Sequence, residues 1–480
     1  MVSSRTKSAE SSVKKSVMSQ PSPQAFSQLP LPEATLANLK NIGFERMTEI
    51  QAQALPPVLA GRDLLGCAKT GSGKTAVFGL GLLQQLDTAD FAVQSMVLCP
   101  TRELAEQVGG EIRRLAQGIQ NVKLLVICGG KAFGPQKASL KYGAHVVVGT
   151  PGRVLDHLIK GSLSVQSLKT LVLDEADRLL DMGFEEDVSA IVSRAPGKRQ
   201  TLLFSATFPD AIEQMSANMQ RKPQRVSVDV EHAPGVIDQL FYETTRARKN
   251  EVLLALFEHY RPTSAVVFCH TRKQCAEVAS YLDQQKIAAR ALHGELDQRQ
   301  RDRTLALFAN GSTAVLVATD VAARGLDIKS LPLVINYELP HDPEVYVHRI
   351  GRTGRAGEKG LALSLVTENE LKRVRNIEEF TTQPCLMDVP ASLDRDSDFT
   401  LKPRMVTLQI EGGKKAKMRK GDLLGALTGD AGLSGDQIGR IDIFPFFSLV
   451  AIERDALRQA MNFLSNGRVK GRSVRARRVS

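Results

Sequence analysis

The segment Ala68–Thr75, AKTGSGKT, decides the fold of the N-terminal half of the chain. It follows a short apolar run, DLLGC (residues 63–67), and overlaps the start of a helical pattern, KTAVFGLGLLQQL (residues 74–86). Gly71 and Gly73 let the backbone approach phosphate oxygens closely, so that its N–H groups and the helix N-terminus surround an anion. A strand, a glycine-rich loop and a helix in this order predict a nucleotide phosphate site.

The residues of this loop have distinct predicted roles. Lys74 places a positive charge at the β- and γ-phosphates of ATP, and the Thr75 hydroxyl is a ligand for Mg²⁺. The generic pattern begins with glycine, whereas this loop begins with Ala68. The predicted nucleotide contacts are Ala68, Lys69, Thr70, Gly71, Ser72, Gly73, Lys74 and Thr75.

An acidic cluster, Asp174-Glu175-Ala176-Asp177, ends a second apolar run, LKTLVL (residues 168–173). Asp174 is predicted to hold Mg²⁺, largely through water, and Glu175 to be the general base that orients the attacking water. Four such residues are weak evidence alone. After a phosphate loop and at a strand end, they predict nucleotide hydrolysis.

Both halves of the chain alternate short apolar runs with helical patterns. Runs that are nearly continuous in Val, Leu and Ile are typical of parallel strands covered by helices on both faces. The first half contains DLLGCA, SMVLCP, LLVICGG, HVVVGTP, LVLDEAD and TLLFSAT, and the second contains SAVVFCH, AARALHG, AVLVATD, LVINYEL and GLALSLV. The pattern predicts an α/β protein with two tandem parallel-sheet domains.

The C-terminal part has a different pattern, β-α-β-β-α-β, which predicts a small α+β domain. The resulting organisation is a disordered basic tail at 1–24, an ATP-binding domain at 25–208, a linker at 209–234, a second α/β domain at 235–384, a linker at 385–403 and the C-terminal domain at 404–480.

The positive charge lies at the two ends of the chain. Residues 404–480 carry 15 Lys and Arg against 7 Asp and Glu (+8), and residues 1–24 carry 4 against 1 (+3). Since the total is +11, residues 25–403 are neutral. A basic attachment on a neutral body predicts a polyanionic partner.

The sequence disfavours a membrane protein and a disulfide-bonded protein. No apolar run reaches the roughly 18 residues that cross a bilayer, and the first residues lack the apolar stretch of a signal peptide. The six cysteines form no metal-binding spacing, and reduced core cysteines are expected. The sequence predicts a soluble cytoplasmic protein with no membrane partner.

From about residue 26 to 370, the motifs resemble those of the DEAD-box helicases of superfamily 2. The resemblance implies two RecA-like domains and an RNA-stimulated ATPase that unwinds or remodels RNA. It implies that Gln51, with an amide that both donates and accepts, selects adenine. Phe26 is the upstream aromatic of that site, and Gly325 and Asp327 are further implied ATP contacts.

The same resemblance implies contacts with the RNA backbone. Hydroxyls, backbone N–H groups and arginines suit sugar–phosphate contacts that carry no sequence information. The implied RNA-binding residues are Pro100, Thr101, Arg102, Gly130, Thr150, Gly152, Arg153, Gln298, Arg301 and Thr319.

The resemblance also implies how hydrolysis is coupled to RNA. Arg352 and Arg355 resemble arginine fingers that reach the γ-phosphate in a closed state. The implied coupling residues are Ser205, Thr207, Asp177 and His348. If ATP and RNA both favour closure, each raises the affinity for the other by the same factor.

The C-terminal domain resembles an RNA-recognition-motif (RRM) fold. Its strands VTLQI and SLVAIE lack the aromatics on which this fold usually stacks bases, so we expect RNA to bind at edges and basic loops. Phe444, Phe446 and Phe447 are expected in the core or at strand ends. The predicted RNA contacts are Lys414, Lys415, Lys417, Arg419, Lys420 and Arg475.

A helicase core with this short module resembles the bacterial DbpA subgroup. That resemblance implies recognition of a 23S rRNA hairpin, in pre-50S particles, during assembly of the large ribosomal subunit. A monomer is expected.

Other functions remain open at this point. A general RNA helicase or chaperone would use the basic tail without specificity, and a DNA-directed helicase would not need the 2′-OH. A non-enzymatic scaffold would be unaffected by Glu175→Gln. An NTPase motor unrelated to RNA would leave the basic tail unexplained.

Overall fold

The computed structural model describes residues 24–68, 71–206, 208, 210–228, 237–323, 331–354, 359–396 and 398–479. The chain divides into two compact units, Met1–Asp229 and Val230–Ser480. Most of the predicted N-terminal tail lies outside the described residues, as do Lys69, Thr70, Thr207, Gly325, Asp327 and Arg355.

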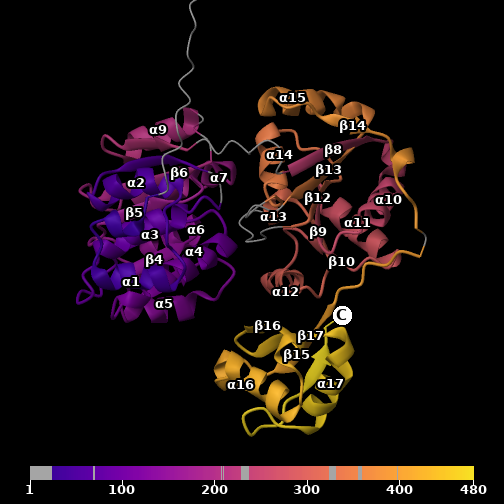
Figure 1. The fold of residues 1–480 in the computed structure, drawn as a ribbon. Coiled ribbons are helices and arrows are strands. Elements are labelled where there is room, and N and C mark those ends of the chain that lie inside the picture. The colour runs from indigo at the N-terminus through magenta and orange to yellow at the C-terminus, as the bar shows by residue number, and fades with distance from the viewer. Residues whose placement is uncertain are drawn as a thin grey trace, which may run out of the picture. The chain divides into compact units, whose positions relative to one another are not determined.

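The first unit contains a seven-stranded parallel sheet in the order β3-β4-β2-β5-β6-β1-β7 (Figure 1). Its strands are β1 (Leu64–Cys67), β2 (Ser95–Leu98), β3 (Leu124–Ile127), β4 (Val146–Gly149), β5 (Thr170–Leu173), β6 (Gln200–Ser205) and β7 (Gln224–Ser227). Its helices are α1 (Glu33–Asn41), α2 (Glu49–Leu59), α3 (Lys74–Gln84), α4 (Arg102–Leu115), α5 (Phe133–Lys141), α6 (Pro151–Ile159), α7 (Ala176–Asp181), α8 (Glu185–Val192) and α9 (Asp210–Met219).

Each face of this sheet has its own apolar core, because successive side chains of a strand point to opposite faces. Leu64 packs in the core formed with α2, α3 and α4, whereas its neighbour Leu65 packs in the core formed with α6 to α9. The apolar runs are therefore continuous, as the predicted parallel sheet requires.

The first domain extends into the segment predicted as a linker, residues 209–234. This segment contains α9 and β7, and β7 pairs with β1 at the edge of the sheet. In β7 only Val226 is buried, while Arg225 and Ser227 are exposed. Such an edge strand lacks the continuous apolar run by which the central strands were found.

The second unit begins with another seven-stranded parallel sheet, in the order β10-β11-β9-β12-β13-β8-β14 (Figure 1). Its strands are β8 (Ile237–Glu243), β9 (Ala265–Phe268), β10 (Ala289–Leu292), β11 (Val315–Ala318), β12 (Leu333–Asn336), β13 (Gly360–Val366) and β14 (Leu386–Asp388). Its helices are α10 (Lys249–Tyr260), α11 (Arg272–Gln284), α12 (Gln298–Ala309), α13 (Asp320–Ala323), α14 (Pro343–Ile350) and α15 (Leu371–Thr381).

The segment 385–403, predicted as a second linker, is partly built into this domain. Its β14 pairs with β8, and Leu401 forms a parallel bridge with Ile287. Short extended pieces held by backbone hydrogen bonds carry no apolar periodicity, so composition does not reveal them.

The C-terminal domain has the predicted order β-α-β-β-α-β. Its antiparallel sheet, β16-β17-β15-β18, has α16 and α17 packed on one face around Leu408, Val450 and Leu464. The elements are β15 (Met405–Glu411), α16 (Lys420–Gly425), β16 (Ile438–Ile443), β17 (Phe447–Glu453), α17 (Leu457–Asn466) and β18 (Ala476–Arg478).

The opposite face of this small sheet packs against the preceding domain. Leu449 of β17 and Val479 join Ala306 and Leu307 of α12 in an apolar cluster. At its edge, Asn310 Nδ2 donates to Thr407 Oγ1 (2.8 Å), which in turn donates to Ser312 Oγ (2.8 Å). These buried hydrogen bonds fix how the two domains align, because a shift would leave the polar atoms of Asn310 and Thr407 without hydrogen-bond partners.

Candidate nucleotide and RNA sites

The predicted site residues of the first unit gather at the carboxyl edge of its sheet. The phosphate loop follows β1, Asp174 follows β5 and Ser205 ends β6. The implied RNA contacts follow β2, β3 and β4. Because the strand order is β3-β4-β2-β5-β6-β1, the nucleotide residues occupy one half of this edge and the RNA residues the other.

The phosphate loop is shaped to receive an anion. Gly73 has φ 97°, and a Cβ there would overlap the Gln51 side chain. Lys74, the first residue of α3, is 7% exposed, and its Nζ has no hydrogen-bond partner among the described residues; the same holds for Ser72 Oγ. A buried ammonium without a partner is costly, so a phosphate group fits here.

The segment predicted to contact adenine is connected directly to that loop. Gln51 Oε1 accepts from Thr48 N (2.9 Å), and its Nε2 donates to Gly73 O (3.2 Å). Thr48 Oγ1 donates to Ser72 O (2.8 Å). Gln51 therefore holds the phosphate loop, a contact that the sequence analysis did not anticipate.

Phe26 lies in the same apolar core as this segment. It is buried and packs edge-to-face on Phe44, with ring centroids 5.8 Å apart. Ala68 is also buried and its N–H donates to Ser205 O (3.0 Å), which links the loop to the end of β6.

The acidic cluster lies at the end of β5. Asp174 is 3% exposed and accepts a hydrogen bond from Glu175 N (3.1 Å). Burial raises the pKa of Asp174 to about 6, opposed by the nearby Lys74 ammonium. Because ionising a buried carboxyl is unfavourable, the site gains from a bound cation.

Glu175 has an unusual backbone conformation. It caps the N-terminus of α7 with φ 51°, in the left-handed region that non-glycine residues seldom adopt. Such strain persists where the surroundings enforce it, and it is frequent at functional sites. Asp177 Oδ2 accepts from Ala206 N (3.4 Å), which connects the acidic cluster to the segment that follows β6.

The RNA half of the edge consists of helix N-termini and glycine turns. Thr101 caps α4 by accepting from Leu104 N (3.2 Å), and Thr150 occupies the N-cap of α6. Gly130 has φ 70° and lies against the Arg102 guanidinium, which leaves no room there for a Cβ.

Arg153 Nη1 donates to Lys131 O (2.8 Å), so the side chain of Arg153 is held in place by the protein itself. Pro100 is buried beside this edge and Gly152 lies in the first turn of α6.

In the second unit, Gln298 and Arg301 lie in the first turns of α12. Gln298 Nε2 donates to Asp302 Oδ1 (2.7 Å) and Arg301 Nη2 to Ala322 O (2.7 Å). Thr319 is buried at the end of β11. His348 belongs to α14 and Arg352 follows that helix, so both depend on how α14 is held.

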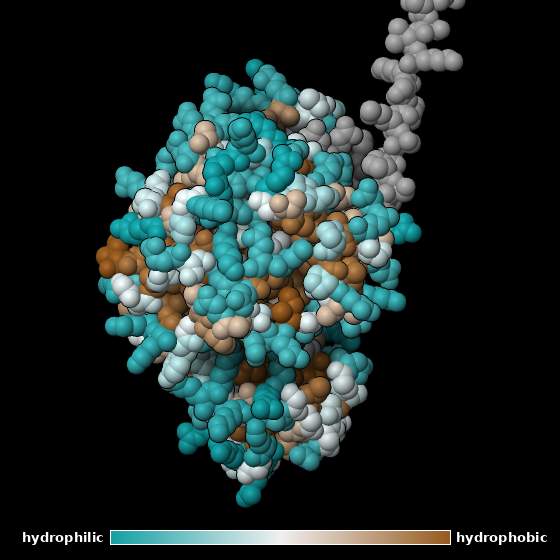
Figure 2. Space-filling model, turned by 90° about the vertical axis from the view of Figure 1, so that its left-hand side faces the viewer, coloured by the Kyte–Doolittle hydropathy of each residue, from teal (hydrophilic) through white to brown (hydrophobic). Residues whose placement is uncertain are grey.

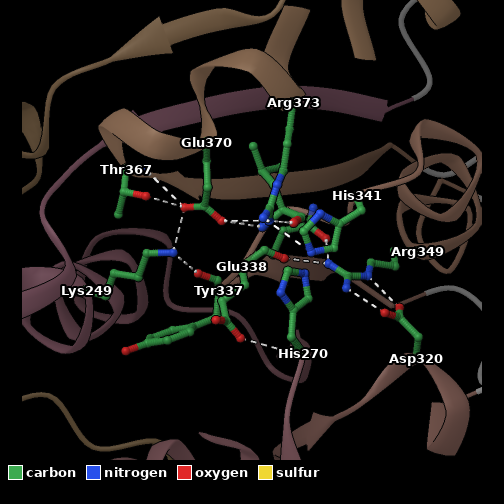
Figure 3. Close-up of polar contacts among 12 residues, drawn as sticks. Lys249, His270, Asp320, Tyr337, Glu338, His341, Arg349, Thr367, Glu370 and Arg373 are labelled. Atoms are coloured by element: carbon green, nitrogen blue, oxygen red, sulfur yellow. Dashed lines mark hydrogen bonds and ion pairs between the residues drawn. The ribbon is translucent and has the colours of Figure 1, made fainter. Parts of the chain in front are cut away.

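Arg349 fixes α14, and the sequence analysis did not single it out (Figure 3). Its side chain is 2% exposed and forms a bidentate pair with Asp320 (2.6 and 2.7 Å). It also donates to Asn336 Oδ1 (3.0 Å) and to Glu338 O (2.7 Å). An arginine fork satisfied on every side is rigid, so the residues beside it are positioned through Arg349. The position of Arg349 within the HRIGRTGR segment was the sequence feature by which it could have been identified.

A second buried ion pair lies nearby (Figure 3). Lys249 Nζ is 2.9 Å from Glu370 Oε2, with side chains 6% and 8% exposed. Lys249 also donates to Tyr337 O (2.7 Å), and Thr367 Oγ1 donates to Glu370 (2.8 Å). Burial raises the pKa of Glu370, but Lys249 and Thr367 outweigh it and hold that pKa below the usual value.

The basic residues of the C-terminal domain are brought together by its fold. Four of them lie on the connection between β15 and α16, and a fifth, Lys420, begins α16; a hydrogen bond from Glu411 N to Arg475 O (2.8 Å) places Arg475 beside them. Hydrophilic side chains cover most of the visible face of this domain, at the bottom of Figure 2. The exposed cations are Lys414, Lys415, Lys417, Arg419, Lys420 and Arg475.

Three family models match the chain in sequence order. They are the DEAD/DEAH box helicase (residues 48–215), the helicase conserved C-terminal domain (residues 248–357) and the DbpA RNA binding domain (residues 407–478). These matches cover the nucleotide edge, the domain that carries Arg349, and the basic C-terminal domain.

Similar proteins and structures agree with these family matches. The ATP-dependent RNA helicase DbpA of Escherichia coli is 52% identical over 94% of this chain and 99% of its own. The helicase CshA of Bacillus cereus is 45% identical over 76% of this chain and 70% of its own. A structure of S. cerevisiae Dbp5 bound to RNA and ADP BeF3 matches with TM-score 0.70 and 31% identity, over 76% of this chain and 96% of that chain.

The chain thus belongs to the DEAD-box family of ATP-dependent RNA helicases, which are RNA-stimulated ATPases. Within that family it is DbpA-like, since the similarity to DbpA includes the RNA-binding domain at the C-terminus. The predicted family and the predicted fold class are both confirmed.

The structure also bears on metal binding, membrane insertion and disulfide formation. Among the described residues, no group of three or more His, Cys, Asp or Glu side chains could hold a metal ion by itself. In the same part of the chain, no helix has the length and apolar character to cross a membrane. None of the six cysteines, all of which the structure describes, forms a disulfide bond.

Proposed function

We propose that this RNA helicase remodels a hairpin region of 23S rRNA during assembly of the large ribosomal subunit, acting as a monomer in the cytoplasm. The observation that carries the proposal is the exposed basic cluster of the C-terminal domain, which is docked on the second helicase domain. Such an arrangement suits a targeting domain that holds one part of a structured RNA while the core acts on another. The resemblance to the DbpA subgroup makes this RNA the first to test.

The proposal gives each catalytic residue one task. The Lys74 ammonium, buried and without a partner in the described chain, neutralises the β- and γ-phosphates of ATP. Glu175 accepts a proton from the attacking water, and its strained backbone holds the carboxylate in place. Arg352 and Arg355 have the arginine-finger role that the family resemblance implies.

Mg²⁺ fits the residues present. The Thr75 hydroxyl and the Asp174 carboxylate are hard oxygen donors, and burial raises the pKa of Asp174 to about 6, so a cation beside it would stabilise its ionised form. Two protein ligands suit a Mg²⁺ that keeps several waters and binds phosphate oxygens. When bound, the ion would supply positive charge at the reacting phosphates, and Asp174 would hold it through water.

The first experiment compares ATPase stimulation by two RNAs of equal length. One is a 23S rRNA fragment that includes the peptidyl-transferase-region hairpin, and the other is an unrelated structured RNA. The proposal expects the 23S fragment to stimulate turnover at much lower concentration. Equal stimulation would leave a general RNA helicase whose basic domain is a non-specific anchor.

Deletion of the C-terminal domain is a poor variant, because it exposes Ala306 and Leu307 of α12. A triple variant, Lys414→Gln, Lys415→Gln and Lys417→Gln, keeps that face covered. It should remove the preference for the 23S fragment and reduce the salt dependence of binding by about one unit of slope per lost phosphate contact. The matched control is Arg458→Gln, an exposed cation on α17 away from the cluster.

Two further variants test the remaining alternatives. Glu175→Gln should retain ATP binding and lose turnover, a result that a scaffold without ATPase activity would not give. A DNA copy of the 23S fragment should fail to stimulate the wild-type enzyme. Equal stimulation by DNA would contradict RNA-specific recognition.

A further inference from the structure

Phe446 is exposed where its two aromatic neighbours are covered. Phe444 and Phe447 stack on each other, with centroids 4.7 Å apart, and pack against the cluster of Leu307 and Leu449. The expectation of packed positions is therefore right for these two. Phe446, between them in sequence, is 61% exposed at the tip of the β16–β17 hairpin. Packing of the protein does not account for an aromatic at this place.

The tip that carries Phe446 is bound firmly to the basic turn after β15. Gly412 N donates to Phe446 O (3.1 Å), Lys414 N to Phe444 O (2.8 Å) and Lys415 N to Pro445 O (3.0 Å). A Cβ on Gly413 would come within 2.9 Å of Phe446 N, so the two backbones approach as only glycine permits. The aromatic ring is thus presented on a rigid support.

A cation of the same turn lies over this ring. Lys415 Nζ lies 4.4 Å from the ring centroid of Phe446, a cation–π contact at the surface. The other cations of the turn are exposed within a few residues of it. An aromatic ring with adjacent cations is the combination that single-stranded nucleic acid requires, since bases stack and phosphates need positive charge.

The usual stacking surface of this fold is not accessible. Thr407 and Leu449 occupy the outer face of the sheet and are buried against α12 and the turn that follows it. RNA bases therefore cannot stack on that face while the two domains are docked. The hairpin tip lies at its edge and remains open.

We propose that Phe446 is a stacking platform for an unpaired RNA base, with Lys415 and its neighbours holding the flanking phosphates. The proposal deepens the proposed function, because it names the part of a structured RNA that the C-terminal domain takes: an unpaired nucleotide in a loop or bulge. Lys415 leaves the ring when the base arrives and pairs with a phosphate.

The test uses the full chain and two RNA probes. One is a short hairpin whose unpaired loop carries 2-aminopurine, and the other is a blunt duplex with the same stem. Affinity is measured by fluorescence anisotropy, and stacking by the quenching of 2-aminopurine. Phe446→Ala should weaken hairpin binding about 5- to 100-fold and abolish the quenching, while duplex binding stays unchanged.

Matched variants separate stacking from apolar contact. Phe446→Tyr should retain both affinity and quenching, whereas Phe446→Leu should behave like Phe446→Ala. Leu424→Ala changes another exposed apolar residue of the domain and should have no effect. Wild-type affinity and quenching in Phe446→Ala, or in Phe446→Leu, would overturn the proposal. The result for Phe446→Leu would indicate an apolar protein contact.

Failure of this proposal differs from failure of the proposed function. If the wild-type enzyme prefers the 23S fragment and Phe446→Ala does too, stacking is refuted and the target stands. If Phe446 controls hairpin binding but the 23S fragment has no advantage, the target is refuted and stacking stands.

Discussion

At the scale of single residues, Gln51 holds the phosphate loop in addition to its predicted contact with adenine. Both polar atoms of its amide are used by the chain, one by Thr48 N and the other by Gly73 O. An alanine at this position would leave the Gly73 carbonyl and the Thr48 amide without these partners. The phosphate loop should then be less well organised before ATP arrives.

We expect Gln51→Ala to raise the KM for ATP about tenfold, since lost buried hydrogen bonds cost roughly 1 to 3 kcal/mol. The kcat should change less, because the acidic cluster is intact. Gln53→Ala is the matched control: it lies in the same helix, is exposed and bonds only to Glu49 at the surface. Steady-state ATPase assays at saturating RNA give both constants. A tenfold effect in the control would refute a specific role for Gln51.

Arg349 gives a second prediction at this scale. Lysine keeps the charge but cannot form the bidentate pair with Asp320 or reach Asn336 and Glu338 at the same time. Arg349→Lys should therefore lower kcat at least about tenfold while ATP affinity stays near the wild-type value. Titration with a fluorescent ATP analogue, together with turnover measurements, separates the two effects. An unchanged kcat would show that α14 does not need this fork.

At the scale of elements, the Lys249–Glu370 pair holds α10 and α15 to the strand-to-helix connection after β12. Removing one member of a buried pair leaves an uncompensated charge, which costs roughly 3 to 5 kcal/mol. Glu370→Gln should lower the unfolding free energy by an amount of that order. Glu251→Gln breaks exposed pairs with Arg248 and Arg395, and it should cost at most about 1 kcal/mol.

The same pair predicts a pH dependence. The folded-state pKa of Glu370 lies below its unfolded value, so its stabilisation is present above the unfolded pKa and is lost as the pH falls through the folded one. Urea unfolding of the wild type should therefore weaken below about pH 4.5. The Glu370→Gln variant should show a smaller loss over that range. Equal pH dependence of both proteins would contradict this assignment.

The elements also show what the sequence could reveal. The central strands and the phosphate loop were predictable, because buried parallel strands are apolar throughout and a glycine loop has a distinct spacing. The edge strands β7 and β14 were not, since an edge strand needs no apolar run. The partners of Arg349 and Lys249 are distant in sequence, so only the folded chain brings them together.

At the scale of the second unit, the contact between α12 and the C-terminal sheet is the feature that pattern analysis could not supply. The absence of aromatics from VTLQI and SLVAIE predicted that bases do not stack there. The structure adds the reason, because Leu449 and Thr407 are buried against the helicase domain. Residues that face another domain must match its shape and polarity. Such matching produces no periodic pattern in the sequence.

Leu449→Asp tests this contact. The carboxylate would be buried against Ala306 and Leu307, so the two domains should separate while each keeps its own core. Trypsin should then cleave after the exposed Arg404 at least about tenfold faster, because the lost apolar burial is worth roughly 1.5 to 3 kcal/mol. Leu424→Asp, at an exposed position of the same domain, should leave the cleavage rate unchanged.

The helix α12 has a consequence of its own. Gln298 and Arg301 lie in its first turns, and Ala306 and Leu307 contact the C-terminal domain, so both sets of residues lie within this one helix of 12 residues. At 1.5 Å per residue, the helix spans about 18 Å. If Gln298 and Arg301 contact RNA as the family resemblance implies, α12 sets the spacing between that RNA and the RNA proposed to bind the C-terminal domain. Adding one turn would shift the two contacts by about 5.4 Å, and substrates whose hairpin and duplex are separated by a fixed distance would no longer match.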